Sequence, residues 1–342
     1  MVRIGDAVPR RVASNTLRAV VAPILEGESP TRTELAPWSV EGVEFGIGED
    51  AQARAFIADS SIVAVVGHAG SGATLMVESL YREAGLPLVV PTATARELRA
   101  VGPHVFMLAP TDDLIGAFLV DESEKRLGVR RLGILHVADA YGEGIRLGVE
   151  RRLRSRGDSL AGAATLTGLE CEQDELALNS VVSAFVQRHQ PDGVIVALPQ
   201  GAAWCAVRAL AREAPSVMIL TTESFVLNES KPLSLAERAN TYALQFWAPG
   251  TDSASMKFVA KVRATMARDP YPSEALEYDA FQVINAAIRA GNVTRPAVMQ
   301  WLRALGTPGH PPFPGVTGPI DFTQPRTSVL RLQALRDEVP PT

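Results

Sequence analysis

The chain has 342 residues, 46% of them hydrophobic, and a formal net charge of −5 at pH 7. Its length suggests about two domains of roughly 150 residues each, and its composition is that of a globular protein with ordinary buried cores. Lysine and arginine are scattered, and the densest basic segment, Arg151–Arg156, is expected to be the solvated end of a helix. These features argue against a surface for nucleic acid or anionic lipid.

The sequence also argues against a membrane span. No segment reaches the roughly 18 consecutive apolar residues that a transmembrane helix needs, so we expect no direct membrane insertion. Residues 1–6 do not have the charged and apolar regions of a signal peptide. We therefore expect either an extracytoplasmic or a cytoplasmic protein.

Short apolar segments alternate with amphipathic segments along most of the chain. Segments of the first kind are typical of buried parallel strands; they are Val43–Ile47, Ile62–Val66, Leu88–Val90, Leu132–Val137, Gly193–Leu198 and Val217–Leu220. Segments of the second kind have helical periodicity; they are Ala73–Ala84, Leu176–Gln187 and Ala202–Ala214. This alternation predicts right-handed crossovers and parallel sheets. Because there are too many units for one small sheet, we expect an α/β fold with two doubly wound parallel-sheet lobes.

Three segments indicate where the chain passes between the lobes. The strand-like Val105–Leu108 meets a helix start at residues 109–112, and the strand-like Tyr242–Trp247 precedes Ala248-Pro249-Gly250. The third segment, Gly306–Pro319, is rich in Pro and Gly. We therefore assign residues 1–109 and 249–309 to lobe I and residues 110–248 and 310–342 to lobe II, joined by a three-segment hinge.

The first lobe has residues suited to an anion. Ligands of open parallel sheets bind beyond the carboxyl ends of the strands, and Ile62–Val66 is followed by a glycine-rich turn that contains Ser71 and opens a helix. Helix-start N–H groups and the Ser71 hydroxyl suit a carboxylate. Thr94, which follows Leu88–Val90, is placed to add a hydroxyl and an N–H to the same anion. For both residues the alternative is a helix cap.

The second lobe has residues suited to a cation. Tyr141 lies at a loop tip after Leu132–Val137, and Glu223 follows Val217–Leu220. A carboxylate at a strand end is a natural partner for an ammonium group, in a charge-assisted hydrogen bond of roughly 1.5–3 kcal/mol. The alternative for Glu223 is a solvated loop acid. A zwitterion would bridge the two lobes.

Catalytic and metal sites are not indicated. The sequence has no Gly-x-Ser-x-Gly motif after a strand, no histidine pair with metal-ligand spacing and no dinucleotide fingerprint. We therefore predict no enzyme activity, no metal and no cofactor. His68 adjoins the proposed site and is expected to be a hydrogen-bonding wall residue. For Cys171 and Cys205 we expect free thiols, with a disulfide as the alternative.

Five stretches together resemble the type I periplasmic solute-binding proteins, in particular the leucine/isoleucine/valine-binding group. The similarity is clearest from about Val43 to Phe322. Its motifs, in order, are Val66-Gly67-His68-Ala69-Gly70-Ser71, Pro91-Thr92-Ala93-Thr94, Asp139-Ala140-Tyr141-Gly142-Glu143-Gly144, Tyr278-Asp279-Ala280 and Gly315-Val316-Thr317-Gly318-Pro319-Ile320-Asp321-Phe322.

The resemblance implies roles for individual residues. The ligand carboxylate would be held by Ser71 and by the segment with Thr92 and Thr94, and the ammonium partly by Glu223. Tyr141 would close from the second lobe. A further tyrosine of the family falls at Pro199 or Gln200 here, so Gln200 is a candidate contact and the preference for the ligand side chain differs.

The implied function is non-catalytic binding of a small amino acid or close analogue in an inter-lobe cleft. The protein would be the substrate-binding component of an ABC transporter, with an ABC permease as partner and a periplasmic location. The alternative is a ligand-sensing regulatory or receptor domain of the same fold, which the lack of a recognisable signal peptide favours.

Overall fold

The computed structural model describes residues 2–7, 21, 33–36, 48–166, 175–225, 233–250 and 252–337. The chain divides into two compact units: unit 1 is Met1–Pro110 with Phe246–Val329, and unit 2 is Thr111–Gln245 with Leu330–Thr342. Because each unit is built from two separate stretches of chain, three connections join the units, at 110/111, 245/246 and 329/330. The predicted strand Val43–Ile47 lies outside the described residues.

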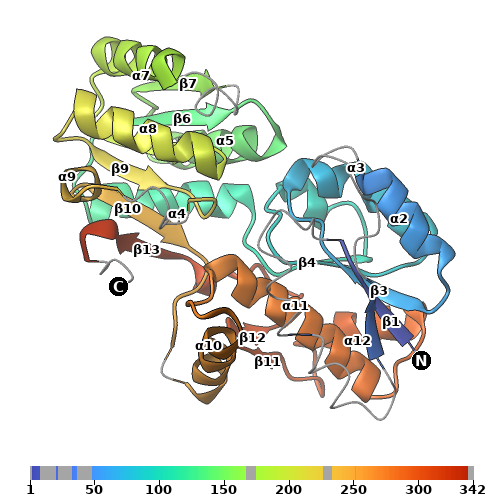
Figure 1. Cartoon of the computed structure of the whole chain (residues 1–342). Helices are drawn as coiled ribbons and strands as arrows, with labels where there is room; N and C mark the ends of the chain where they lie inside the picture. Colours follow the sequence, from blue (N-terminus) through green and yellow to red (C-terminus); the bar gives the residue numbers. More distant parts are fainter. Residues whose placement is uncertain are drawn as a thin grey trace. The chain divides into compact units, whose positions relative to one another are not determined.

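Unit 1 contains a five-stranded parallel sheet with the order β2-β1-β3-β4-β5. Its strands are β1 Val2–Asp6, β2 Thr33–Ala36, β3 Ile62–Val66, β4 Leu88–Val90 and β5 Val105–Met107. Helices α2 Glu49–Ala58 and α3 Ser71–Glu83 cover one face, and α11 Pro272–Arg289 and α12 Arg295–Ala304 lie against the other (Figure 1). The remaining elements are η1 Arg96–Arg99, α10 Ser253–Met266, the hairpin of β11 Phe313–Gly315 and β12 Gly318–Ile320, and η2 Thr327–Val329.

Unit 2 contains a six-stranded sheet with the order β13-β10-β9-β8-β6-β7, in which only β13 runs antiparallel. Its strands are β6 Leu132–Val137, β7 Gly162–Leu166, β8 Gly193–Ala197, β9 Met218–Thr221, β10 Thr241–Gln245 and β13 Arg331–Ala334. Its helices are α4 Asp112–Lys125, α5 Ala140–Arg154, α7 Glu175–His189, α8 Gln200–Glu213, α9 Leu235–Arg238 and η3 Leu335–Asp337. Helix α4 packs against α5, and α7 packs against α8.

The central strands are completely buried, which explains why their apolar pattern predicted them well. Every residue of β3, β6 and β8 is buried, because helices cover both faces of a parallel sheet and its strands become continuous apolar runs. The predicted helix Ala73–Ala84 begins earlier, at Ser71, with Gly70 as its N-cap. The predicted α/β fold class is confirmed.

The third connection lies elsewhere than the sequence suggested. Residues 310–329 belong to unit 1, although the Pro- and Gly-rich composition of Gly306–Pro319 had suggested a crossing there. The β11–β12 hairpin is held within unit 1 because Asp279 of α11 accepts hydrogen bonds from the backbone N–H groups of Val316 and Thr317. Composition marked the turn but could not show what it packs against.

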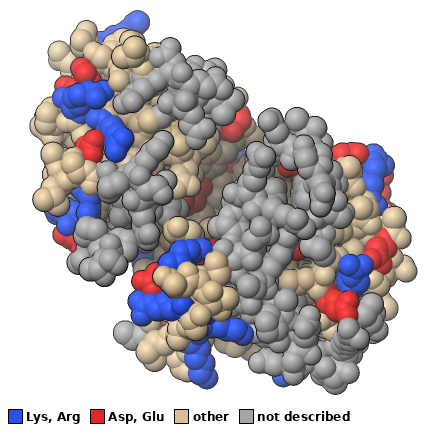
Figure 2. Space-filling view, viewed as in Figure 1, with Lys and Arg blue, Asp and Glu red and all other residues tan. Residues whose placement is uncertain are grey.

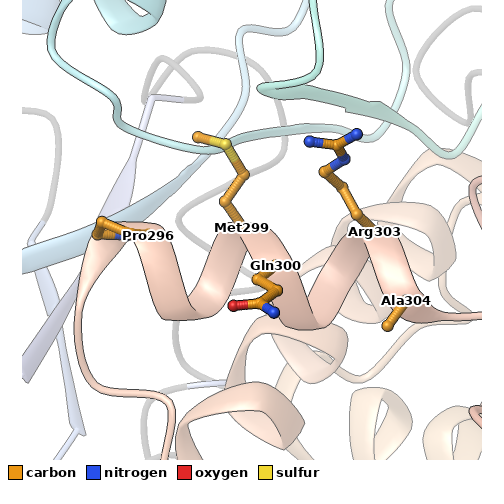
Figure 3. Close-up of a pocket in the computed structure, with 5 residues that line it drawn as sticks. All are labelled: Pro296, Met299, Gln300, Arg303 and Ala304. Atoms are coloured by element: carbon orange, nitrogen blue, oxygen red, sulfur yellow. The ribbon is translucent and has the colours of Figure 1, made fainter.

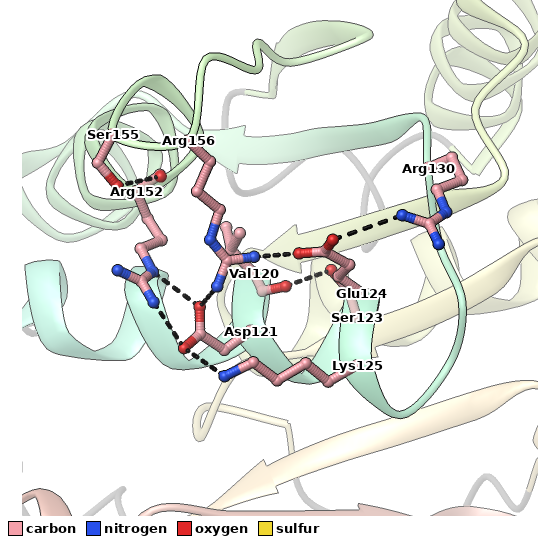
Figure 4. A network of polar contacts seen from close by, with 9 residues as sticks. All are labelled: Val120, Asp121, Ser123, Glu124, Lys125, Arg130, Arg152, Ser155 and Arg156. Carbon is pink, nitrogen blue, oxygen red and sulfur yellow. Dashed lines mark hydrogen bonds and ion pairs between the residues drawn. The ribbon is translucent and has the colours of Figure 1, made fainter.

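The basic segment at the end of α5 is not simply solvated. Arg152 donates to Asp121 of α4 over 2.7 and 2.9 Å, and Arg156 pairs with both Asp121 and Glu124 (Figure 4). These ion pairs fasten α5 to α4. On the face shown in Figure 2, basic and acidic side chains are interspersed on the described surface of each unit, which agrees with the scattered charges of the sequence.

Among the described residues, none of the helices has the length and apolar character required to span a membrane. Cys205, on α8, is disulfide-bonded, so the expectation of a free thiol is wrong for this residue. Cys171, the other cysteine of the sequence, lies outside the described residues.

Candidate functional site

Ser71 of unit 1 is the first residue of α3 and follows the end of β3. Its Oγ accepts hydrogen bonds from the backbone N–H groups of Thr94 and Ala95 over 3.2 and 3.1 Å. A hydroxyl has two acceptor positions and one donor, so these contacts leave Ser71 its O–H for donation. Ser71 is not the helix cap, because that position is Gly70. Its hydroxyl and the first N–H groups of α3 suit an anion.

The two threonines after β4 stand close to Ser71 but have other partners. The Thr92 hydroxyl donates to the carbonyl of Ala69 over 3.0 Å. The Thr94 N–H, expected to face the anion, instead donates to Ser71. Thr94 is not the cap of the following 3-10 helix, which is Ala95. In this structure the Thr94 N–H therefore positions the Ser71 hydroxyl. Of the two Thr94 groups predicted to contact a ligand, only the Thr94 hydroxyl remains for that contact.

His68 is directed into the core of unit 1. Its side chain is only 1% exposed, and its Nε2 lies 3.0 Å from the hydroxyl of Tyr81 on α3. Burial lowers the pKa of His68 to about 3, so the ring is neutral at physiological pH. The predicted hydrogen-bonding side chain is present, but its burial argues against direct contact with a ligand.

Unit 2 gathers three hydroxyls from the segments that follow β6 and β9. The Tyr141 hydroxyl donates to Thr222 Oγ1 over 2.6 Å, and Thr222 Oγ1 lies 3.1 Å from Ser224 Oγ. Ser224 donates to the carbonyl of Leu198 over 2.7 Å. Tyr141 is positioned by the start of α5, where Asp139 caps the helix by accepting from the Gly142 N–H over 2.8 Å. The hydroxyls therefore form a fixed polar cluster.

Glu223 lies in the sequence between Thr222 and Ser224, two members of this cluster. Its Oε2 atom is buried and has no hydrogen-bond partner among the described residues. Burial raises the pKa of Glu223 to about 7, and a backbone N–H group and, to a smaller extent, the nearby Tyr141 hydroxyl oppose part of that rise. Burial also raises the pKa of Tyr141 well above its usual value, with Glu223 and then Asp112 adding to the shift. A buried carboxylate that lacks a countercharge is suited to bind a cation.

Sequence reasoning therefore placed Tyr141 and Glu223 at the same sheet edge, where the structure brings them together. It missed the partners Thr222 and Ser224, although both adjoin Glu223 in sequence, and it missed the buried Asp112 at the start of α4. Gln200, the first residue of α8, is exposed at the end of β8. Hydroxyl partners of this kind depend on strand register, which a sequence pattern does not give.

Two pockets of unit 1 lie away from these residues. One, of about 410 Å³, has described lining residues that all belong to α12, where Met299 and Arg303 project to one side and Gln300 to the other (Figure 3). The other, of about 550 Å³, is lined by residues of α10, α11 and the β11–β12 hairpin. Neither includes a predicted site residue. Within the described part of the chain, no three His, Cys, Asp or Glu side chains are grouped so as to hold a metal ion.

Two parallel-sheet units joined by three connections, each with polar residues beyond its strand ends, define a binding protein of the two-lobed α/β class. The chain belongs to the periplasmic binding protein family, whose model matches residues 49–331. It is similar to a Pseudomonas aeruginosa protein described as a leucine-, isoleucine-, valine-, threonine- and alanine-binding protein, with 26% identity over 106 residues, 31% of this chain and 28% of that protein. The chain thus matches little more than a quarter of the length of its curated relatives.

Solved structures show the likeness over almost the whole chain. An ABC transporter substrate-binding protein from Desulfitobacterium hafniense, in complex with Leu, has a TM-score of 0.76 and 25% identity and matches over 94% of this chain and 92% of its own. A solute-binding protein from R. palustris, in complex with 4-hydroxybenzoate, has a TM-score of 0.78 and 15% identity over 94% of this chain and 88% of its own. The predicted resemblance to type I binding proteins of the leucine/isoleucine/valine-binding type is confirmed, while the relatives bind different ligands.

Proposed function

We propose that this protein binds a small amino acid without catalysing a reaction, as the substrate-binding component of an ABC transporter. Its partner would be an ABC permease, and its location extracytoplasmic. The observation that carries the proposal is the Glu223 carboxylate, whose Oε2 is buried without a hydrogen-bond partner among the described residues. An ammonium group would supply the missing countercharge.

The proposal assigns the opposite charge of the ligand to unit 1. The Ser71 hydroxyl is left as a donor by its two backbone contacts, and the start of α3 favours negative charge. A carboxylate satisfies both. We assign Ser71 and the Thr94 hydroxyl to the ligand carboxylate, and Glu223, supported by Tyr141, to the ammonium. Thr92 and Gln200 would adjoin the ligand side chain.

An aromatic carboxylate is the ligand class that most needs to be separated from an amino acid, because one structural relative holds 4-hydroxybenzoate. Such a ligand would satisfy the anion side of the site and leave Glu223 without a countercharge. Burying that unpaired charge further is unfavourable. An amino acid therefore fits the charges of unit 2 better.

The experiment is a thermal-shift screen at pH 8 with the amino acids, their deaminated 2-hydroxy analogues, and 4-hydroxybenzoate. A ligand at 100 times its dissociation constant adds about 2.7 kcal/mol of stability. We expect stabilisation by one or more small amino acids and little or none by the matching hydroxy acids. Equal stabilisation by an amino acid and its hydroxy analogue, or by 4-hydroxybenzoate alone, would contradict the proposal. An alternative role as a sensing domain of the same fold predicts the same ligand but no binding to a permease in a pull-down.

A further inference from the structure

Residues next to all three connections converge on one turn of unit 1. Unit 1 ends at Pro110, resumes at Phe246 and ends again at Val329. Leu108, Trp247 and Arg326 lie within three residues of these three points. Each makes a hydrogen bond to the β11–β12 turn or to a side chain that the turn holds.

The turn itself is fastened to α11 by one buried carboxylate. Asp279 Oδ1 accepts from the Val316 N–H over 2.8 Å, and Oδ2 accepts from the Thr317 N–H over 2.8 Å and from the Thr317 hydroxyl over 2.5 Å. The approach is close enough to require glycine at position 315, where a Cβ atom would lie 2.5 Å from Asp279 Oδ2. Asp279 is therefore committed to the turn.

Arg326 ties this turn to the first and third connections. Its guanidinium is buried; Nη1 donates to the Leu108 carbonyl over 3.2 Å, and Nη2 donates to the Thr317 carbonyl over 3.1 Å and to Thr317 Oγ1 over 2.9 Å. The Thr317 hydroxyl thus accepts from Arg326 and donates to Asp279. It links a buried cation to a buried anion without direct contact between the two charges, and both charges keep hydrogen-bond partners.

The second connection reaches the same turn from the other side. The Trp247 Nε1 donates to the Val316 carbonyl over 3.1 Å, and the Trp247 ring packs edge-on against Phe258 of α10 with ring centres 5.7 Å apart. Val316 therefore donates to Asp279 with its N–H and accepts from Trp247 with its carbonyl. All three connections are held to unit 1 through two adjacent residues of one hairpin.

We propose that Asp279, Val316, Thr317 and Arg326, here called the hairpin anchor, hold the three connections to unit 1 as one element. Arg326 is a positioning residue and does not touch the ligand. Bending between the units is then confined to the chain beyond Leu108, before Trp247 and beyond Arg326, and the three connections bend together. The part of this inference that concerns ligand-driven closure rests on the proposed function.

Hydrogen–deuterium exchange of the ligand-free protein tests the anchor without any ligand. The variants are Thr317→Val, which removes the bridging hydroxyl at constant size, Thr317→Ser, which keeps it, and Arg326→Met. The control is Arg295→Met, because Arg295 also donates to several backbone carbonyls of unit 1, at Ile62, Ile57 and Asp59, but adjoins no connection.

We expect exchange in peptides covering residues 108–112, 244–248 and 326–331 to rise about tenfold or more in Thr317→Val and Arg326→Met, as for loss of a charge-assisted hydrogen bond. In Thr317→Ser, exchange of these peptides should stay near the wild-type rate. Arg295→Met should leave their exchange unchanged, even where it lowers the melting temperature as much as Thr317→Val or Arg326→Met does. A rise in only one connection, or an equal rise in Arg295→Met, would overturn the proposal.

A second experiment tests whether the hairpin anchor contributes to closure of the two units on a ligand. It titrates the protein with L-leucine and follows the titration by solution scattering. We expect Arg326→Met to weaken leucine binding several-fold while Thr317→Ser and Arg295→Met do not. Unchanged binding in Arg326→Met with faster exchange at all three connections would remove the closure role and leave the anchor. Failure of the wild-type protein to bind leucine or any other amino acid would reject the proposed function, while the exchange result still decides on the anchor.

Discussion

The candidate residues of unit 1 and unit 2 follow strands of the same kind, but their polar atoms are satisfied in opposite ways. Around Ser71, each described side-chain contact is a hydrogen bond between neutral groups, and the two acceptor positions of its Oγ are filled by backbone N–H groups. Around Glu223, a carboxylate oxygen is buried without a hydrogen-bond partner among the described residues, and burial raises the pKa of the group to about 7.

This difference suggests that unit 1 contributes affinity for the ligand carboxylate, while unit 2 determines which ligands are selected. The unit 1 residues lose little when no ligand is bound, because the hydroxyl and the helix start are already held in place. Ionised Glu223 is unfavourable without a cation nearby, since its charge is desolvated. We therefore expect unit 1 to accept many carboxylates and unit 2 to decide which of them carries an ammonium group.

The largest effect is expected for Glu223→Gln. Removing one partner of a buried, hydrogen-bonded charge pair typically costs 2–5 kcal/mol, so the dissociation constant of the best amino acid should rise roughly 30-fold or more. Calorimetric titration of the wild type and the variant measures this directly. Glutamine keeps the size of the side chain and removes only the charge.

The matching control is the deaminated hydroxy acid, which has the same carboxylate and side chain. Its affinity should be low for wild type and should rise in Glu223→Gln, because the variant no longer buries an unpaired charge. A wild-type protein that binds the hydroxy acid as tightly as the amino acid would show that Glu223 does not recognise an ammonium group.

The next effect is a dependence of binding on pH. With a pKa of about 7 in the ligand-free protein, Glu223 is mostly ionised at pH 8 and mostly protonated at pH 6. Binding of an ammonium needs the ionised form, so affinity should fall about tenfold from pH 8 to pH 6, following the protonated fraction. Titrations at several pH values measure it, and Glu223→Gln should have a nearly flat profile.

The contribution of Glu223 to the stability of the ligand-free protein should change with pH in the direction opposite to that of ligand affinity. A carboxyl group whose pKa is raised by folding contributes stability below its unfolded pKa, and that contribution is lost as pH rises through about 7. The difference in melting temperature between wild type and Glu223→Gln should therefore move against the wild type from pH 5 to pH 8. A constant difference would mean that Glu223 titrates normally.

The sequence predicted the sheets and the residue types at their edges because both follow from local pattern. Buried strands such as β3 and β8 are continuous apolar runs, and Ser71 and Glu223 come directly after strands. The sequence did not predict that Thr94 turns its N–H to Ser71, that His68 faces Tyr81, or that residues 310–329 pack with unit 1. Each of these depends on contacts between segments far apart in the chain, of which Arg326 to Leu108 is the clearest example.

Ser71→Ala should have a smaller effect on binding and a larger effect on stability. The N–H groups of Thr94 and Ala95 would lose their acceptor, and a buried unsatisfied donor costs about 1–3 kcal/mol. We expect the melting temperature of the ligand-free protein to fall by several degrees. Affinity should fall only a few-fold, because the N–H groups at the start of α3 still face the carboxylate. Loss of affinity as large as in Glu223→Gln would contradict the division between the units.

The smallest effect is expected for Tyr141→Phe, and it tests how the hydroxyl cluster supports Glu223. The Tyr141 hydroxyl donates to Thr222 Oγ1 over 2.6 Å, and its dipole beside Glu223 opposes part of the rise in the pKa of that carboxyl. Without the hydroxyl, the ionised form of Glu223 loses a stabilising dipole and its pKa should rise further. The midpoint of the pH profile should then move to higher pH by a few tenths of a unit to about one unit, while affinity at pH 9, where Glu223 is ionised in both proteins, changes little. A midpoint that moves to lower pH, or a large loss of affinity at pH 9, would mean that Tyr141 acts on the ligand directly and not through Glu223.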